Sequence, residues 1–125
     1  MNIPTDLKYT KDHEWIKIDG NSVIIGITEF AAKELGDIVF VEVDTVGDEV
    51  ASGDVFGTIE AVKTVSDLFM PLTGTIDEFN DTLEDSPEAI NQDAYKAWIV
   101  KVTMQEGADL SELMDAKAYK EIIGQ

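Results

Sequence analysis

Closely spaced turn residues divide the middle of the chain into short apolar runs, and this pattern limits the folds available to it. From Gly47 to Phe79, glycine, proline and aspartate recur every few residues between short stretches that contain valine, isoleucine and phenylalanine. Such short runs do not support long helices, and β-branched and aromatic residues favour strands. The pattern therefore predicts an all-β core of short strands.

The flanking segments extend this prediction. Residues 8–19 alternate between apolar and polar positions, and Asp19-Gly20-Asn21 is a hairpin turn signal before the apolar run 22–25. Residues 37–43 also alternate, but the start of this strand is apolar on both faces, which predicts that part of it is central in a sandwich. Residues 97–104 predict a further strand.

Capping patterns predict a few helices. Thr28 fits an N-cap and Gly36 fits the position after a helix end, so a short helix is expected near residues 29–35. Asp109 with Glu112 fits a capping box, and helices are therefore expected near residues 109–123.

Together these elements predict one domain, residues 1–125, that is mostly β. The expected architecture is a flattened barrel or sandwich of two antiparallel sheets with helices at its edge. Residues 80–93 are acidic and are expected to be a loop, with a break at Ser86-Pro87.

Composition excludes several classes of function. The chain has nine lysines, no arginine and 26 acidic residues, and its net charge of −17 argues against nucleic acid or an anionic membrane as partner. It has no cysteine and one histidine, so neither a thiolate nor a multi-histidine metal site is predicted. The N-terminus lacks a signal-peptide core and a basic transit peptide, and no apolar run reaches membrane-spanning length, so a cytoplasmic location is expected.

One lysine is set apart from the other charges. Lys63 is the only cation between Lys33 and Lys96, a window that also contains sixteen carboxylates. It sits in the centre of IEAVKTVSD, residues 59–67, which reads as two strands that meet at a tight turn. A primary amine at such a tip can be acylated to a stable amide, whereas an ordinary lysine on a turn is simply solvated surface.

The sequence around this lysine resembles a lipoyl-attachment hairpin. The matching positions are Gly47, Val50, Gly53, Asp54, Glu60, Lys63, Ser66, Asp67, Pro71 and Gly74. Four further segments, in the same order along the chain, resemble the H-protein family of the glycine cleavage system: His13-Glu14-Trp15, Gly26-Ile27-Thr28-Glu29, residues 35–41, and Ile90-Asn91 before Trp98. The resemblance covers about Leu7 to about Tyr119.

This resemblance implies a carrier that is not itself an enzyme. Lipoic acid would be bound covalently to Lys63 by a lipoate-attaching enzyme. The carrier would take an aminomethyl group from glycine decarboxylase, a pyridoxal-phosphate enzyme, and pass it to an aminomethyltransferase. Dihydrolipoyl dehydrogenase would then reoxidise the dithiol. The protein is expected to be monomeric between these encounters.

The family pattern also implies a cleft that shelters the loaded arm. Glu14 and Asp67 are the acids that this pattern places near the terminal ammonium, although both also fit plain surface acids. The family commonly has serine before the histidine, and this chain has Asp12 instead, which adds a third candidate carboxylate. His13 is expected to have a structural role rather than a catalytic one.

Other functions remain as alternatives. A biotinyl carrier shares the hairpin but resembles A-M-K-M at the tip, where this chain has Val62 and Thr64 beside Lys63. An H-like relay that donates lipoyl groups to other acceptor domains would have the same lysine and the same fold. No Ser-His-Asp set, Cys-His set or phosphate-binding glycine loop supports an enzyme.

Overall fold

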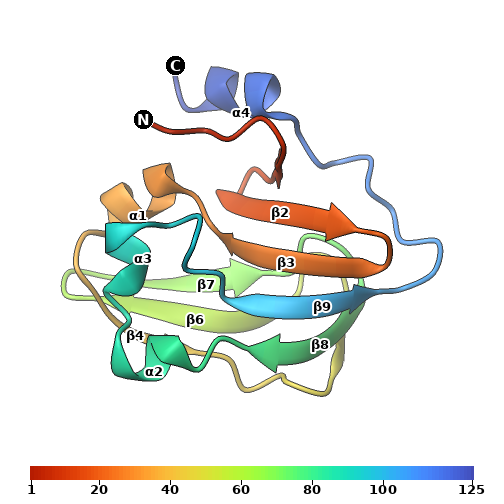
Figure 1. The fold of residues 1–125 in the computed structure, drawn as a ribbon, viewed down its shortest axis with the longest axis horizontal. Helices are drawn as coiled ribbons and strands as arrows, with labels where there is room; N and C mark the ends of the chain where they lie inside the picture. The colour runs from red at the N-terminus through yellow and green to blue at the C-terminus, as the bar shows by residue number, and fades with distance from the viewer.

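Nine strands form two antiparallel sheets in the computed structural model, which describes residues 1–125 (Figure 1). The order across the six-stranded sheet is β1 (Lys8–Tyr9), β2 (Glu14–Asp19), β3 (Ser22–Ile27), β9 (Val100–Met104), β8 (Gly74–Phe79) and β5 (Glu49–Val50). The order across the three-stranded sheet is β4 (Ile38–Glu42), β6 (Val55–Ala61) and β7 (Val65–Phe69). The prediction of a mostly β domain with two antiparallel sheets is confirmed.

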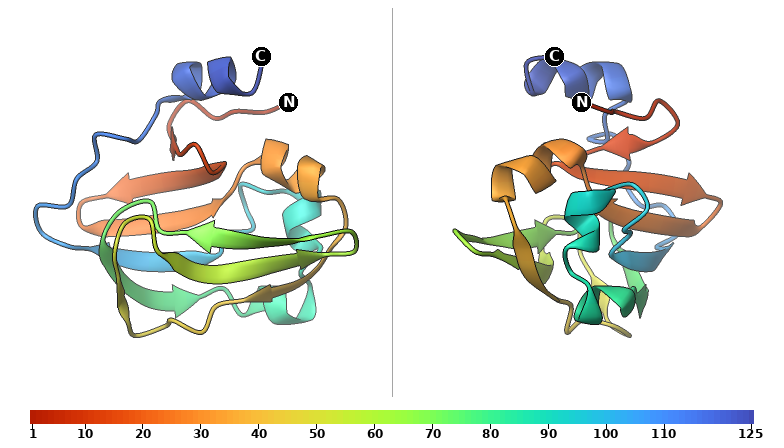
Figure 2. Two further views of the ribbon diagram at one scale, coloured as in Figure 1. Left: turned by 180° about the vertical axis from the view of Figure 1, so that it is seen from behind. Right: turned by 60° about the vertical axis from the view of Figure 1, so that its left-hand side comes forward.

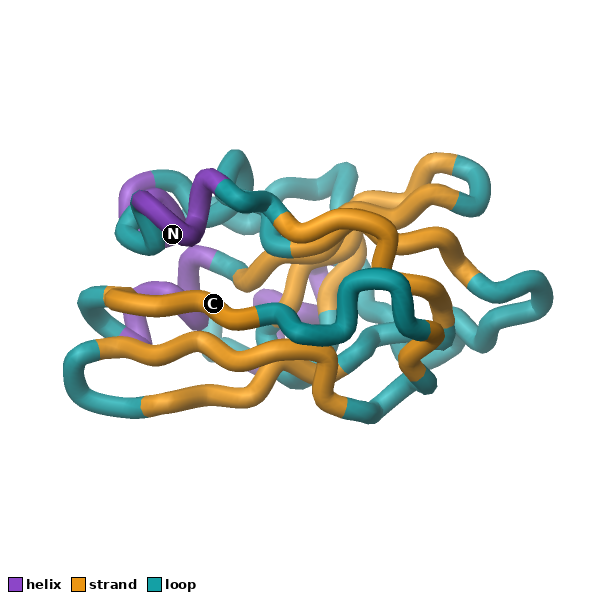
Figure 3. Tube along the Cα trace, turned by 90° about the horizontal axis from the view of Figure 1, so that it is seen from below, coloured by secondary structure: helices purple, strands orange, loops and turns teal.

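Four short helices lie at the edges of the sheets. They are α1 (Glu29–Leu35), α2 (Thr82–Asp85), α3 (Ala89–Gln92) and α4 (Ala116–Ile122). The first three gather at the end of the molecule where the β6–β7 hairpin has its tip (Figures 1 and 3). None of the helices is long and apolar enough to cross a membrane.

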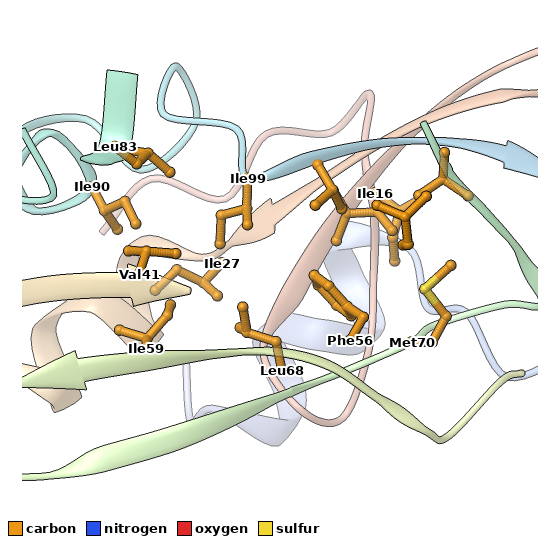
Figure 4. Close-up of a cluster of buried hydrophobic side chains, with 14 of the residues drawn as sticks. Ile16, Ile27, Val41, Phe56, Ile59, Leu68, Met70, Leu83, Ile90 and Ile99 are labelled. Carbon is orange, nitrogen blue, oxygen red and sulfur yellow. The ribbon is translucent and has the colours of Figure 1, made fainter. Parts of the chain in front are cut away.

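The main core fills the space between the two sheets. Alternate residues of the strands point inward, and side chains such as Ile16, Phe56, Ile59 and Ile99 are completely buried and face one another (Figure 4). Each such side chain contributes about 1.5–3 kcal/mol by leaving water. The predicted strand alternation therefore accounts for the stability of the sandwich.

A second, smaller core joins the two ends of the chain. Tyr9 and Tyr119 are fully buried and stack with ring centroids 4.8 Å apart, and Trp15 packs beside them. These residues come from β1, α4 and β2, so the C-terminal helix is fixed above the β1–β2 edge of the larger sheet (Figure 2).

Local signals placed several elements correctly. The turn at residues 19–21 joins β2 to β3 as expected. The N-cap of α1 is Thr28, whose side chain accepts a hydrogen bond from Ala31 N, and Gly36 ends the helix with φ = 77°. That left-handed conformation favours glycine.

The predicted helix near residue 109 is wrong. Residues 109–114 are irregular apart from a turn at Ser111 and Glu112, Asp109 Oδ1 accepts a hydrogen bond from Ser111 N, and only α4 is helical in the C-terminal segment. Met114 exchanges both backbone hydrogen bonds with Tyr9, which removes its backbone groups from any helix. Pairing with β1 therefore overrides the capping pattern.

Two other expectations need correction. Ile38 and Val41 of β4 face the core of the sandwich as expected, but β4 is an edge strand, and Val39 and Phe40 are 48% and 47% exposed rather than covered. The acidic segment 80–93 contains the one-turn helices α2 and α3, separated at the predicted break. Each helix turns one apolar residue, Leu83 or Ile90, into the core, which anchors an otherwise polar segment.

Candidate functional site

A tight turn between β6 and β7 presents Lys63 at the tip of the hairpin. Ala61 N donates a hydrogen bond to Thr64 O at 2.7 Å and closes the turn, which leaves Val62 and Lys63 as its two central residues. Val62 is 75% exposed and Lys63 is also exposed. The structure therefore brings the lysine to the position expected from the alternation around it.

The connection between α1 and β4 supports the base of this turn. Val62 N donates to Asp37 O at 2.9 Å. Asn91, from α3, holds both sides of Asp37, because its Nδ2 donates to Gly36 O at 2.8 Å and its Oδ1 accepts from Ile38 N at 3.0 Å. A side chain of α3 thus fixes the backbone on which the hairpin rests.

The side chain of Lys63 passes close to the end of α1. A Cβ atom placed on Gly36 would lie 3.5 Å from Lys63 Cε and 3.9 Å from its Nζ. The ion pairs of the protein are Lys33 with Glu29 and Lys101 with Glu78, so no carboxylate lies within 4.0 Å of the Lys63 ammonium. The amine is accessible and forms no ion pair, despite the net charge of −17.

An apolar cleft of about 410 Å³ lies between α1 and the hairpin. Phe30, Ala31, Leu35 and apolar residues of β3, β6 and β7 line its walls, and its polar lining consists of Asp12, His13, Glu34, Ser66 and Asp67. This volume is within the range of ligand sites. A second hollow, of about 400 Å³, is bordered by α1 and α3 and has a mostly polar lining.

The three candidate carboxylates differ in position. Asp12 and Asp67 both line the cleft, whereas Glu14 does not and is only 2% exposed. Thr10 Oγ1 donates to Glu14 Oε1 at 3.2 Å, and Phe69 N donates to Oε2 at 2.9 Å. Burial raises the pKa of Glu14 to about 8, although the hydrogen bond from Phe69 acts in the opposite direction.

The imidazole of His13 forms part of the cleft wall. Its centroid lies 4.9 Å from that of Phe30, and its Nδ1 lies 2.9 Å from Tyr119 Oη. Burial lowers the pKa of His13, against the attraction of Asp12 and Glu34 for a proton. Tyr119 could not be predicted at this site, because no local sequence pattern relates it to His13, which lies 106 positions earlier in the chain.

The two tryptophans do not line this cleft. Trp15 is 3% exposed and its indole N–H donates to Ala94 O at 3.0 Å. Trp98 lies under Lys101, whose Nζ is 4.7 Å from the ring centroid. Both act in packing.

The fold and the site together define a class of small carrier domains built around a hairpin lysine. A sequence model of the family "Glycine cleavage H-protein" matches residues 7–125. The glycine cleavage system H proteins of Staphylococcus saprophyticus and Staphylococcus haemolyticus are 55% and 54% identical to this chain, with full coverage of both sequences. The crystal structure of a glycine cleavage system H protein from Mycobacterium marinum superposes with a TM-score of 0.90 at 41% identity and covers 98% of this chain and 100% of that one.

The chain belongs to the glycine cleavage H-protein family. Its role is that of a lipoyl carrier in the glycine cleavage system, and it is not a catalyst.

Proposed function

We propose that Lys63 carries the lipoyl group, as an amide between its Nζ and the carboxyl group of lipoic acid. The observation that carries this proposal is an exposed amine, free of ion pairs, on a hairpin tip beside an apolar cleft. A rigid turn presents the amine to a lipoate-attaching enzyme while the base of the hairpin stays fixed by Asp37 and Asn91.

The residues around Lys63 suit such an arm. From ordinary bond lengths the modified side chain extends roughly 14 Å beyond its Cα. The side chain already passes the end of α1, and the inner face of that helix lines the cleft. When bound, the dithiolane supplies exchange between disulfide and dithiol, chemistry that a cysteine-free chain lacks.

We also propose that the cleft shelters cationic cargo on the arm. Asp12 and Asp67 line the cleft and can attract an ammonium group, and the apolar walls keep water away from it. Glu14 lies beside them with its carboxyl group already hydrogen-bonded. Its direct contact with the ammonium stays a prediction, and such contact requires the carboxyl group to ionise.

Within the glycine cleavage system, the proposed partners are glycine decarboxylase, the aminomethyltransferase and dihydrolipoyl dehydrogenase. The charge of −17 favours docking on basic surfaces of these larger enzymes. The cytoplasmic location expected from the N-terminal sequence also stays a prediction.

The carrier proposal is tested by single-turnover reduction with purified glycine decarboxylase and glycine. After exposure to a lipoate-attaching enzyme and lipoate, the parent protein should gain one aminomethyl thioether and one free thiol per arm as CO2 is released, whereas Lys63→Arg should gain neither. Lys96→Arg, at another exposed lysine outside the hairpin, is the matched control and should behave as the parent. Full reduction of the Lys63→Arg protein would refute the proposal.

The shelter is tested by the lifetime of the loaded carrier. Once the decarboxylase is removed, release of formaldehyde and ammonia should be faster for Asp67→Asn and Asp12→Asn than for the parent. Asp48→Asn removes the same charge from an exposed turn outside the cleft and should leave the lifetime unchanged. Equal lifetimes for all four proteins would contradict a role for the two cleft carboxylates.

A further inference from the structure

The C-terminal helix contacts the cleft wall through one hydroxyl group. Tyr119 Oη lies 2.9 Å from His13 Nδ1 and 2.7 Å from Thr28 Oγ1, and the tyrosine ring is fully buried against Tyr9. The three residues that share this hydroxyl belong to the segment before β2, the N-cap of α1, and α4. Two of these segments line the cleft: the one that contains His13, and helix α1.

The distances allow either direction for the two hydrogen bonds at this hydroxyl, and the N-cap role of Thr28 favours one of them. Thr28 is completely buried, and its Oγ1 accepts a hydrogen bond from Ala31 N at 3.2 Å as the N-cap of α1. Its own hydroxyl hydrogen is therefore free to donate to Tyr119 Oη. Tyr119 then donates to His13 Nδ1, and a ring nitrogen that accepts a hydrogen bond carries no proton. With this direction the imidazole proton is on Nε2.

The backbone, not this hydroxyl, holds His13 in place. His13 is the one non-glycine residue with positive φ, at 66°. Its N–H donates to Thr10 O at 3.1 Å and its carbonyl accepts from Thr28 N at 3.0 Å, so this costly conformation is fixed on both sides. The backbone of His13 is therefore fixed without Tyr119, whose hydroxyl is the hydrogen-bond partner of the ring itself.

We propose that Tyr119 is a positioning residue of the carrier cleft, whose hydroxyl keeps His13 as the neutral Nε2–H tautomer. The cleft wall then offers a hydrogen-bond donor without a positive charge. Asp12 and Glu34 are the acidic groups that act on this imidazole, and Asp67 also lines the cleft. An imidazolium would occupy these carboxylates and repel an ammonium group on the arm, so this consequence rests on the proposed shelter function.

The tautomer is tested by ¹⁵N NMR of the imidazole, which is unambiguous because His13 is the only histidine. The probe is the protein without lipoate, so the result does not depend on the attachment at Lys63. The parent should show the Nε2–H pattern and Tyr119→Phe should show a mixture of tautomers or a protonated ring. Tyr9→Phe removes the other hydroxyl of the stacked pair, which donates to Pro4 O, and should match the parent. A pure Nε2–H pattern in Tyr119→Phe would overturn the proposal.

The consequence for the cleft is tested with the loaded carrier. Loss of one hydrogen bond should shorten the lifetime of the cargo by about three- to tenfold in Tyr119→Phe and leave it unchanged in Tyr9→Phe. The rate of lipoylation should not change, because the base of the hairpin is held by hydrogen bonds to Asp37 and Asn91, and Tyr119 takes part in none of them. A tautomer change with no loss of lifetime would refute the link to cargo, while failure of lipoylation in the parent would refute only the proposed attachment.

Discussion

Burial of Glu14 should make the stability of this fold depend strongly on pH. The carboxyl group is 2% exposed, and burial raises its pKa from 4.5 to about 8. The folded state therefore holds a proton that the unfolded chain releases, so stability is fully present below pH 4.5 and falls as the pH rises toward 8. At 1.36 kcal/mol per pH unit, this shift corresponds to about 3–5 kcal/mol, a large part of the 5–15 kcal/mol typical of a domain.

The substitution Glu14→Gln isolates this effect. A glutamine oxygen can accept the hydrogen bond from Phe69 N, and its amide can donate to Thr10 Oγ1, so the variant imitates the protonated carboxyl group. We expect the variant and the parent to have similar stability near pH 4.5. The advantage of the variant should grow by about 3–5 kcal/mol by pH 8.

Urea unfolding of both proteins across this pH range is the assay. Differences between variant and parent cancel the titration of the other acids, and Glu106→Gln, which removes a carboxylate from an exposed position, is the matched control. A difference between Glu14→Gln and the parent that stays constant from pH 4.5 to pH 8 would refute the reasoning, because it would mean that Glu14 ionises normally in the folded protein.

Three further predictions concern packing, the hairpin and docking. Gly26→Ala places a Cβ 2.5 Å from the ring of Trp15 and should lower the free energy of unfolding by about 3 kcal/mol, measured by thermal or urea unfolding. Gly20→Ala is the comparison: the space around it is open, but its φ is positive, so its cost should be about 1 kcal/mol. Asn91→Asp loses the hydrogen bond donated to Gly36 O, which should lower the free energy of unfolding by about 1 kcal/mol and slow lipoylation measured by mass spectrometry. An unchanged rate of lipoylation would show that Asn91 does not support the hairpin. Association with glycine decarboxylase, followed by stopped flow, should slow clearly as salt increases, and a rate independent of salt would remove electrostatic steering from the account.

The fold could be predicted from the sequence where the signal is local. The turn at residues 19–21, the Thr28 cap and the hairpin around Lys63 each depend on residues adjacent in the chain, and each is found in the structure. The helix expected near residue 109 failed because Met114 pairs with Tyr9, a contact across more than a hundred residues.

The burial predicted for the start of β4 was wrong at two apolar residues that are exposed. Val39 and Phe40 suggested a strand covered on both faces, but a register shift between Ile38 and Phe40 accompanies their exposure at the edge of the sheet. A rule that places apolar side chains in the core of one chain does not anticipate two exposed apolar residues at a sheet edge.

At the candidate site, the residues could be predicted from the sequence, but the burial of each carboxyl group could not. The family resemblance indicated Asp12, Glu14 and Asp67 together, whereas the structure separates two cleft carboxylates from one buried group bonded to Phe69. The contribution of Tyr119 depends entirely on how the C-terminal helix packs.

Peptide mass mapping after lipoylation tests the central claim most directly. Incubated with a lipoate-attaching enzyme, ATP and lipoate, the parent protein should gain the mass of one lipoyl group, located on the peptide that contains Lys63, while Lys63→Arg should gain none. Lys63 is one of nine lysines, so the position of the label is informative. A lipoyl group on any other lysine, or on the Lys63→Arg protein, would contradict the account.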